Sequence, residues 1–376
     1  MFILSNPYVS DFMIKTIKEN GFKVLDNEIA RKYFQINELV GEIEAKKETI
    51  FYSNSENSID WIIENKPNSQ ISKMIQVSKD KIEFRKMLSK IYPDYYFEEI
   101  TFDEIQNFKP KKYPFILKPS VGFLSFGVYP IYDAIGFENV KLQIQDDIKK
   151  FENIFPTSVV NCSKFLIEEM ISGDEYAIDA YFDENGEAVI LNIFQHPFLG
   201  DNDVSDRVYY TSKNIIQKYL NCFKELLDKI GSAGNYKNFP FHLELRANEN
   251  MIVPIELNPM RFCGWCITDI AHFAWGINPY IYFEKKLKPD WNEILKDKND
   301  DFYYFTIGDI PKFVDKSKIT GIDWDKYLKT ISNPLDVRKI DYKTKPVFAI
   351  CFGQCDNLDE INNHLKANMP DYIRLN

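Results

Sequence analysis

Apolar and polar residues alternate at the start of the chain in a pattern that predicts a small β-α-β unit. The apolar runs 2–4 and 22–25 read as short strands, and residues 10–20 carry apolar side chains at helical spacing before Gly21 ends the helix. The turn over 5–7 reads Ser-Asn-Pro and has no glycine fingerprint, so we do not expect a dinucleotide there.

From residue 79 onward the pattern changes to helices that alternate with β-hairpins. Hairpin strands are expected over 113–118 and 128–132, 175–183 and 188–194, and 239–245 and 251–257. Helices are expected over 79–90, 141–154 and 215–230, the last ended by Gly231, and a strand over 346–352 precedes a helix over 358–367.

These patterns predict an α/β protein made of α+β lobes in three parts. A short N-terminal βαβ domain covers 1–78, a long central domain covers 79–310, and a small C-terminal extension covers 311–376. The extension carries no motif, and two roles stay open for it: capping the site or forming a homodimer interface.

The charge balance narrows the classes of partner. Lys and Arg number 46 against 56 Asp and Glu, a net charge of −10. This negative net charge argues against binding to nucleic acid or to an anionic membrane, because proteins that bind them present a basic surface. Because no apolar run is long enough for a signal peptide or a membrane span, we expect a cytoplasmic protein that acts on small molecules.

Six cysteines in 376 residues are too few for a disulfide framework. Cys263 and Cys266 form one close pair and Cys351 and Cys355 another, so a four-thiolate zinc site and a redox motif remain alternatives. Free cysteines are among the most buried residues in proteins, and we therefore interpret these four as core residues.

A lysine followed by a glycine-containing loop is the first candidate binding element. Lys118 ends an apolar strand, and the loop after it contains Ser125 and ends at Gly127. The ammonium, the hydroxyl and the backbone N–H groups of such a loop suit phosphate oxygens. Val128 stands where a P-loop has its lysine, so this is not a P-loop, and a solvated hairpin tip is the alternative.

The second element is an acidic segment that contains Glu168, Glu169, Ile171 and Glu175. The backbone of an extended linker can bind the edge of a purine, and a carboxylate a few residues later can accept both ribose hydroxyls. A solvated acidic turn is the alternative.

The third element is the last hairpin of the central domain. His242 and Glu244 share one face of the first strand by the two-residue period, and Glu256 and Asn258 share one face of the second. If the strands pair, two carboxylates and an amide oxygen meet, which suits Mg²⁺. A carboxylate within the apolar run 251–257 is otherwise a costly choice.

These elements, in this order, resemble the ATP-grasp superfamily over about residues 79–310. Glu256-Leu257-Asn258-Pro259 reproduces its E-x-N-P signature. The resemblance implies an ATP-grasp fold behind a Rossmann-like pre-ATP-grasp domain, with ATP held between two lobes and the small nucleotide lobe over about 112–172. It also implies ATP and Mg²⁺ as cofactors, with Mn²⁺ as an alternative ion.

The resemblance carries roles over to residues of this chain. Lys81 and Lys118 would bind phosphates, with Lys79 and Lys86 as alternatives to Lys81, and Ser125 and Gly127 would cover the phosphates. Glu168, Glu169 and Ile171 would line the adenine pocket, and Glu175 would bind the ribose. Glu244, Glu256 and Asn258 would hold the metal. Arg261 would neutralise the transferred phosphate or a substrate carboxylate and, with Lys118, act in catalysis, although Met260 separates Arg261 from the usual N-P-R spacing. The candidate substrate contacts are His196, Asp201, Arg207 and His242.

The resemblance implies that ATP phosphorylates a substrate carboxylate and that an amine attacks the acyl phosphate. A kinase-like phosphotransferase and a non-catalytic ATP-binding protein are the alternatives. Aromatic residues make up 15% of the chain, and several flank these elements, including Phe123, Phe126 and Trp265. We therefore predict an apolar or aromatic carboxylate or amine as substrate.

Overall fold

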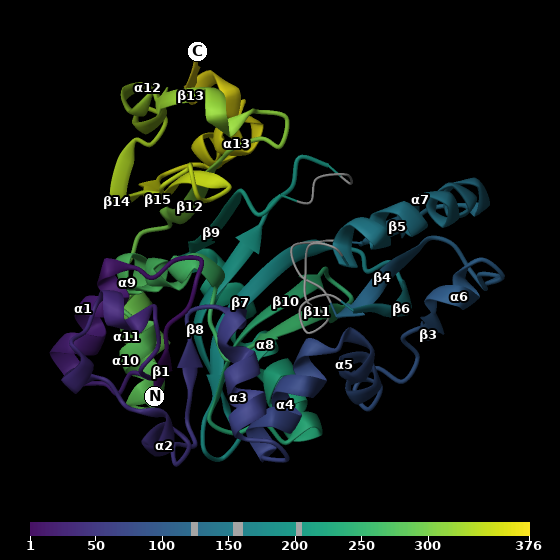
Figure 1. The fold of residues 1–376 in the computed structure, drawn as a ribbon, viewed down its shortest axis with the longest axis horizontal. Helices are drawn as coiled ribbons and strands as arrows, with labels where there is room; N and C mark the ends of the chain where they lie inside the picture. The colour runs from purple at the N-terminus through teal and green to yellow at the C-terminus, as the bar shows by residue number, and fades with distance from the viewer. Residues whose placement is uncertain (122–126, 153–160, 201–204) are drawn as a thin grey trace.

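The computed structural model describes residues 1–121, 127–152, 161–200 and 205–376 (Figure 1). In the N-terminal part of the chain, β1 (Phe2–Ile3) pairs in parallel with β2 (Tyr52–Ser53), and the predicted helix after β1 is present. Helix α1 (Asp11–Asn20) begins at Ser10, whose hydroxyl accepts a hydrogen bond from the Met13 backbone, and ends at the left-handed Gly21. Instead of the second predicted strand, Val24 makes a single bridge to Phe2.

The helix predicted over 79–90 is α5 (Lys81–Leu88), and a second helix that was not predicted, α4 (Gln70–Lys79), precedes it. Asp80 separates them with an extended backbone, and its carboxylate accepts hydrogen bonds from the backbone of Ile82 and Glu83. An aspartate N-cap thus sets the start of α5. Lys81 is therefore the first residue of α5.

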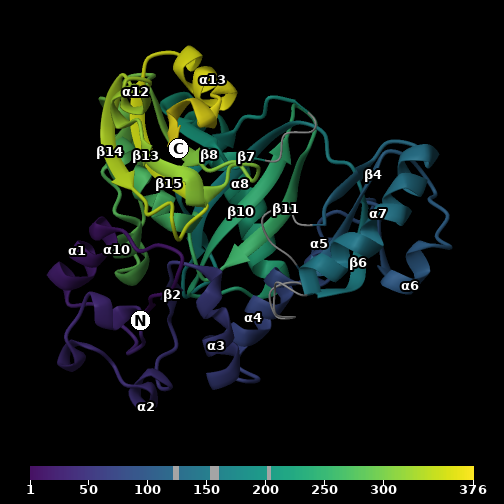
Figure 2. The same ribbon diagram turned by 45° about the horizontal axis from the view of Figure 1, so that its top comes forward.

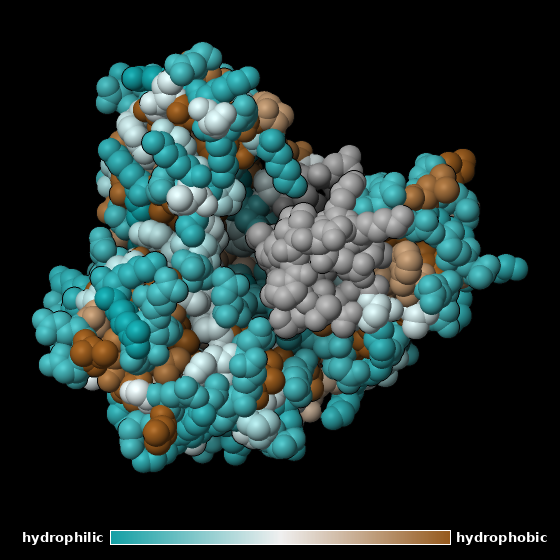
Figure 3. Space-filling view, viewed as in Figure 1, coloured by the Kyte–Doolittle hydropathy of each residue, from teal (hydrophilic) through white to brown (hydrophobic). Residues whose placement is uncertain are grey.

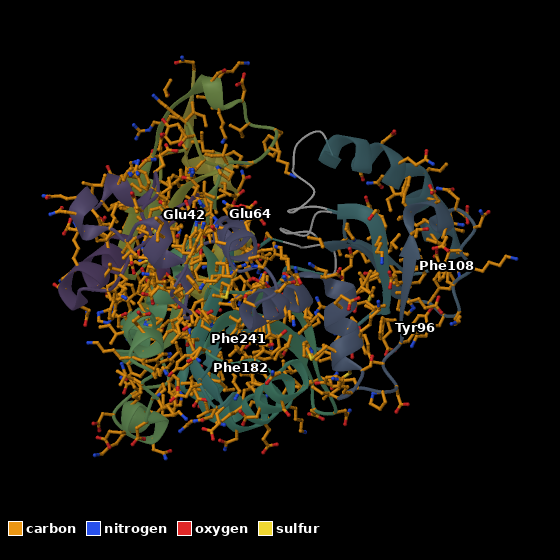
Figure 4. The ribbon with its side chains drawn as sticks, turned by 60° about the horizontal axis from the view of Figure 1, so that its bottom comes forward. Glu42, Glu64, Tyr96, Phe108, Phe182 and Phe241 are labelled. Carbon is orange, nitrogen blue, oxygen red and sulfur yellow. The ribbon has the colours of Figure 1, made fainter. Side chains whose placement is uncertain are left out.

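A four-stranded antiparallel sheet forms the small lobe of the molecule. Its strand order is β3 (Phe97–Thr101), β6 (Asn161–Glu169), β4 (Phe115–Val121), β5 (Tyr129–Ile131). Helices α6 (Phe102–Ile105) and α7 (Ala134–Glu152) complete it. Phe115 and Phe137 belong to a core separate from that of the rest of the chain, and Tyr96 and Phe108 pack against this core (Figure 4). The small lobe is thus an independently packed unit.

An eight-stranded sheet forms the centre of the molecule. Its order is β11 (Ile252–Pro259), β10 (Phe239–Ala247), β7 (Asp174–Phe182), β8 (Ala188–His196), β9 (Val208–Ser212), β12 (Phe302–Asp309), β15 (Val347–Cys355), β14 (Asn333–Lys339). All three predicted hairpins are present: β4–β5 in the small lobe, and β7–β8 and β10–β11 in this sheet. The small lobe lies beside the β10–β11 end of this sheet in both views (Figures 1 and 2).

Helix α8 (Lys213–Gly234) packs on this sheet and extends past the predicted stop at Gly231. The helix ends instead at Asn235, which adopts the left-handed conformation. A Cβ at position 231 would lie 2.7 Å from Cε1 of Phe182. Gly231 therefore permits close packing between helix and sheet, where Phe182 also stacks on Phe241 with ring centroids 4.6 Å apart (Figure 4).

The C-terminal residues continue the central sheet through β14 and β15, and they add α13 (Leu358–Lys366) as predicted. The remaining elements are α2 (Glu42–Ala45), α3 (Ile59–Asn65), α9 (Ile270–Trp275), α10 (Pro279–Glu284), α11 (Trp291–Lys296), β13 (Ile319–Ile322), α12 (Trp324–Leu328) and β16 (Ile373–Leu375).

The face seen in Figure 3 is mostly hydrophilic, with small, separate apolar patches. Within the described ranges, no helix has the length and apolar character needed to cross a membrane.

Candidate active site

The β10–β11 hairpin, called the metal hairpin below, brings the predicted metal ligands together. Its register pairs Glu244 with Glu256 and His242 with Asn258. The side-chain amide of Asn258 donates to Oε1 of Glu244 at 3.3 Å and to Oε1 of Glu256 at 3.4 Å. The two-residue alternation of the sequence thus translates into one polar cluster on a single face of the sheet.

The two carboxyl groups of this cluster differ in their electrostatic surroundings. Burial, reinforced by the charge of Glu256, raises the pKa of Glu244 well above its ordinary value. Burial also opposes ionisation of Glu256, but the Lys81 ammonium, 2.7 Å from its Oε2, holds the pKa of Glu256 below its ordinary value. Lys81 thus neutralises only one of the two acids.

This donor set fits a hard divalent cation. Two carboxylates and the Asn258 amide oxygen offer the oxygen ligands that Mg²⁺ prefers, and a cation would relieve the repulsion that disfavours ionisation of Glu244. In the part of the chain that the structure describes, no group of three or more His, Cys, Asp and Glu side chains has the arrangement of a metal site. Asn258, whose amide contacts both carboxylates, is the third ligand that the sequence predicted.

Lys118 belongs to a buried group of three charges that we call the charge triad. Its Nζ lies 2.5 Å from Oε1 of Glu168, and Nε of Arg85 donates to the other oxygen of Glu168 at 2.5 Å. Although burial opposes its ionisation, these two cations lower the pKa of Glu168 to about 2. Burial lowers the pKa of Lys118, and the positive charge of Arg85 adds to this effect.

The predicted nucleotide contacts lie next to the charge triad, at the junction of β6 and β7. The Glu169 carboxylate accepts from the Tyr96 backbone at 3.0 Å, and Ile171 is buried. Glu175 lies 2.9 Å from Nδ1 of His196 and also pairs with Arg246. Gly127 adopts the left-handed conformation with φ 71°, whereas Ser125, Phe123 and Phe126 lie outside the described residues.

Arg261 follows the metal hairpin and contacts the N-terminal domain. Its Nη2 and Nε donate to Oε1 of Glu56 at 2.6 and 3.1 Å, and Glu56 also pairs with Lys79. Although burial opposes its ionisation, the charges of Lys79 and Arg261 lower the pKa of Glu56 below its ordinary value. The spacing of residues gives no signal for this contact, because 205 positions separate Glu56 from Arg261.

The two predicted substrate histidines are buried near the cluster. Nδ1 of His242 lies 2.7 Å from Oδ1 of Asp179, and its Nε2 lies 3.9 Å from Oε1 of Glu244. His196 lies between Glu175 and the Ser205 carbonyl, and its ring stacks on Tyr209 with centroids 3.9 Å apart. His242 is thus at the metal hairpin, whereas both ring nitrogens of His196 already have partners.

Arg207 does not have the position that we expected for a substrate anchor. Its Nη1 donates to the carbonyls of Leu365 and Ala367, and its Nη2 pairs with Asp309 at 3.1 Å. The guanidinium therefore holds the C-terminal extension beside β9, with Nη1 and Nη2 engaged in these contacts. Asp201 lies outside the described residues.

The aromatic residues after the metal hairpin divide into core and partly exposed groups. Phe262 and Trp275 are buried. Trp265 is only partly buried, stacks on Tyr8 of the N-terminal domain with centroids 6.4 Å apart, and has a left-handed backbone with φ 57°. Trp265 and Tyr8 therefore form a stacked pair, called the aromatic wall below.

Four of the cysteines lie in the protein interior, in agreement with their interpretation as core residues. Cys263, Cys266, Cys351 and Cys355 are all buried and free. Burial raises the pKa of each of these thiols, so they have the character of apolar packing groups.

Comparison with known structures shows the same fold in several ligases. An L-amino acid ligase from Bacillus licheniformis aligns over 100% of this chain and 98% of its own, with 14% identity and a TM-score of 0.67. An N5-carboxyaminoimidazole ribonucleotide synthetase from Thermotoga maritima aligns over 100% and 98%, with 15% identity and a TM-score of 0.62. At these identities the likeness establishes the fold.

Two sequence comparisons agree with this fold. A D-alanine–D-alanine ligase from Petrotoga mobilis is 27% identical over 127 residues, which span 34% of this chain and 38% of that ligase. The family model described as an ATP-grasp domain matches residues 111–269. This range contains the charge-triad residues Lys118 and Glu168 and the whole metal hairpin. Residues 111–269 therefore match the ATP-grasp domain, in agreement with the resemblance of the sequence motifs to that superfamily.

Proposed function

We propose that this protein is an ATP-dependent carboxylate–amine ligase. The observation that carries the proposal is the pairing of Glu244, Glu256 and Asn258 on the metal hairpin, opposite a small lobe that contributes Lys118. The relatives named above support it, because their names describe ligases and synthetases.

The proposed reaction has two steps. A carboxylate oxygen of the substrate attacks the γ-phosphorus of ATP, the bond from that phosphorus to the β,γ-bridging oxygen breaks, and ADP leaves. The nitrogen of the amine then attacks the carbonyl carbon of the acyl phosphate, the bond from that carbon to the phosphate oxygen breaks, phosphate leaves, and the nitrogen loses a proton. Such phosphoryl transfer depends on alignment and charge neutralisation.

The residues of the chain supply these two effects. Lys81 and Lys118 bind phosphate oxygens, and Arg261 neutralises the transferred phosphate or the substrate carboxylate. Glu244, Glu256 and Asn258 would hold Mg²⁺, which supplies charge neutralisation to the phosphates of ATP. The backbone around Glu169 and Ile171 binds the adenine, with Glu175 at the ribose.

The proposed substrates are small molecules with an apolar or aromatic side chain on the carboxylate or amine component. The support for this is the aromatic wall of Tyr8 and Trp265, which involves the N-terminal part of the chain that Arg261 also contacts through Glu56. Aromatic rings suit an apolar group, and a guanidinium suits a carboxylate.

The test is a screen of carboxylate and amine pairs for ADP release, with mass detection of the joined product. We expect an amide product with at least one apolar or aromatic pair and loss of ADP release when either component is omitted. ADP release together with a stable phosphorylated product would instead identify a phosphotransferase. Equal activity on small charged substrates would contradict the substrate class.

A further inference from the structure

Arg85 is a buried guanidinium that connects the two parts of the proposed nucleotide site. It lies on α5, one helical turn after Lys81, and is only 2% exposed. On one side it donates to Glu168 of the small lobe. On the other side its Nη1 donates to the carbonyl of Pro254 at 2.6 Å and its Nη2 to that of Ile255 at 3.4 Å, next to Glu256.

The charge triad around Arg85 contains one more positive charge than negative charge. Arg85 and Lys118 share the single carboxylate of Glu168, and all three residues are buried. The ring of Tyr95, whose centroid is 4.8 Å from Cζ of Arg85, covers the guanidinium, and its hydroxyl donates to Glu168 at 3.2 Å. The charge triad therefore carries one positive charge that no carboxylate of the triad neutralises, in a buried region of low dielectric constant.

The two cations of the triad are not equivalent. Arg85 donates to the carboxylate of Glu168 and to two backbone carbonyls. Lys118, by contrast, has Glu168 as its partner in the triad. If Lys118 moved to a phosphate oxygen, Glu168 would keep Arg85 as its counter-ion. Without Arg85, the same movement would leave a buried carboxylate with no cation, which is costly.

We propose that Arg85 is a positioning residue that frees Lys118 for the nucleotide phosphates by keeping Glu168 neutralised. The inference rests on the proposed function and assigns Arg85 no contact with the nucleotide. The same side chain fixes the distance between the small lobe and the strand that carries Glu256, so the phosphate and metal sites share one anchor.

The test uses the full chain, Mg²⁺ and a fluorescent N-methylanthraniloyl derivative of ADP as the probe. In the variant Arg85→Met, we expect the dissociation constant of the probe to rise on the order of tenfold or more, since Lys118 then stays with Glu168. Competition by adenosine, which has no phosphate, should change less than about twofold. The variant Arg85→Lys should lie between the wild type and Arg85→Met.

The double variant Arg85→Met, Glu168→Gln separates this role from a packing role. An amide at position 168 needs no counter-ion, so Lys118 is free again, and we expect the affinity to return to within about threefold of the wild type. Arg31→Met is the matched control, because its guanidinium pairs with Asp26 on the surface. It should bind the probe as the wild type does.

Three results would overturn this inference but leave the proposed function standing. They are an unchanged affinity of Arg85→Met for the probe, an equal loss of affinity for the probe and for adenosine, and a double variant that binds the probe as weakly as Arg85→Met. A folded wild-type protein that binds no nucleotide would overturn the proposed function and the inference with it.

Discussion

At the scale of single residues, the candidate site is a set of buried charges whose acids differ in their counter-ions. Lys81 neutralises Glu256, Arg85 and Lys118 neutralise Glu168, and burial together with the charge of Glu256 raises the pKa of Glu244. Buried charges are tolerated only when they are compensated. Glu244 is therefore the position at which a bound cation would contribute most.

Replacement of Glu256 by Gln should lower the rate of ADP release about a hundredfold or more, because it removes one of two charged oxygen ligands. The measurement is steady-state ADP release at saturating Mg²⁺, with Mn²⁺ binding as a second readout. Glu249→Gln, at an exposed position in the turn of the same hairpin, is the control and should retain activity. Unchanged turnover in Glu256→Gln would remove the catalytic metal assignment.

The depressed pKa of Glu168 predicts a pH-dependent contribution to stability. Its pKa falls from 4.5 to about 2 on folding, despite the opposing effect of burial. The ionised group therefore stabilises the fold by up to about 3 kcal/mol above pH 4.5, and this contribution is lost as the pH falls toward 2.

Urea unfolding of the wild type and of Glu168→Gln at about pH 6 and pH 3.5 checks this prediction. The difference in free energy of unfolding between the two proteins should shrink by about 1 kcal/mol at the lower pH. A difference that is independent of pH would show that the triad does not lower this pKa.

At the scale of secondary-structure elements, the hairpins were predictable and the helix boundaries less so. The pairings in β7–β8 and β10–β11 follow from alternation over neighbouring residues, which is local information. The break at Asp80 depends on whether a carboxylate caps a helix, and the continuation of α8 through Gly231 depends on the ring of Phe182. Both are decided by contacts that the periodicity does not contain.

The sequence predicted the strand β15 but not its neighbours β12 and β14. Both strands pair with β15. Polar residues and a proline interrupt the pattern of β14, whereas β12 contains an unbroken, mostly apolar run over 302–307. The prediction of the site was incomplete as well. The candidate ligands came from local motifs, but Arg85 and Glu56 were missed because their partners lie 83 and 205 residues away.

The packing of α13 against β12 predicts a stability that depends on pH near neutrality. His364 of α13 lies 3.3 Å from the hydroxyl of Tyr304, and burial lowers the pKa of its imidazole from 6.5 to about 4. The unfolded chain binds this proton first, so stability is full above pH 6.5 and falls as the pH drops toward 4.

Lowering the pH from about 7 to 5 should cost about 2 kcal/mol through this group. The variant His364→Gln removes the titrating group, so its free energy of unfolding should lose less over the same interval. Parallel pH profiles for the two proteins would contradict the prediction.

At the scale of the whole molecule, buried ion pairs join parts of the chain that are distant in sequence. Arg85 links the small lobe to the metal hairpin, and the pair between Glu56 and Arg261 links the N-terminal domain to the same hairpin. Arg207 similarly ties the C-terminal extension to β9. The site is therefore assembled by interdomain contacts as well as by the hairpin itself.

The variant Glu56→Gln should lower the free energy of unfolding by about 3 kcal/mol, because it leaves the buried Arg261 without its carboxylate partner. Chemical denaturation measures this loss. Glu42→Gln is the control, because the exposed side chain of Glu42 (Figure 4) pairs with the exposed Lys46. This substitution should lower the free energy of unfolding by less than about 0.5 kcal/mol. Equal losses for the two variants would mean that the Glu56 contact contributes little to joining the domains.

The most direct test of the proposed function is the fate of a carboxylate oxygen. With a substrate whose carboxylate carries ¹⁸O, an acyl phosphate transfers one labelled oxygen to the phosphate that is released when the amine attacks. We predict one ¹⁸O atom in the phosphate for each amide formed. Unlabelled phosphate, or ¹⁸O retained in a stable phosphorylated product, would contradict the assignment of this protein as a carboxylate–amine ligase.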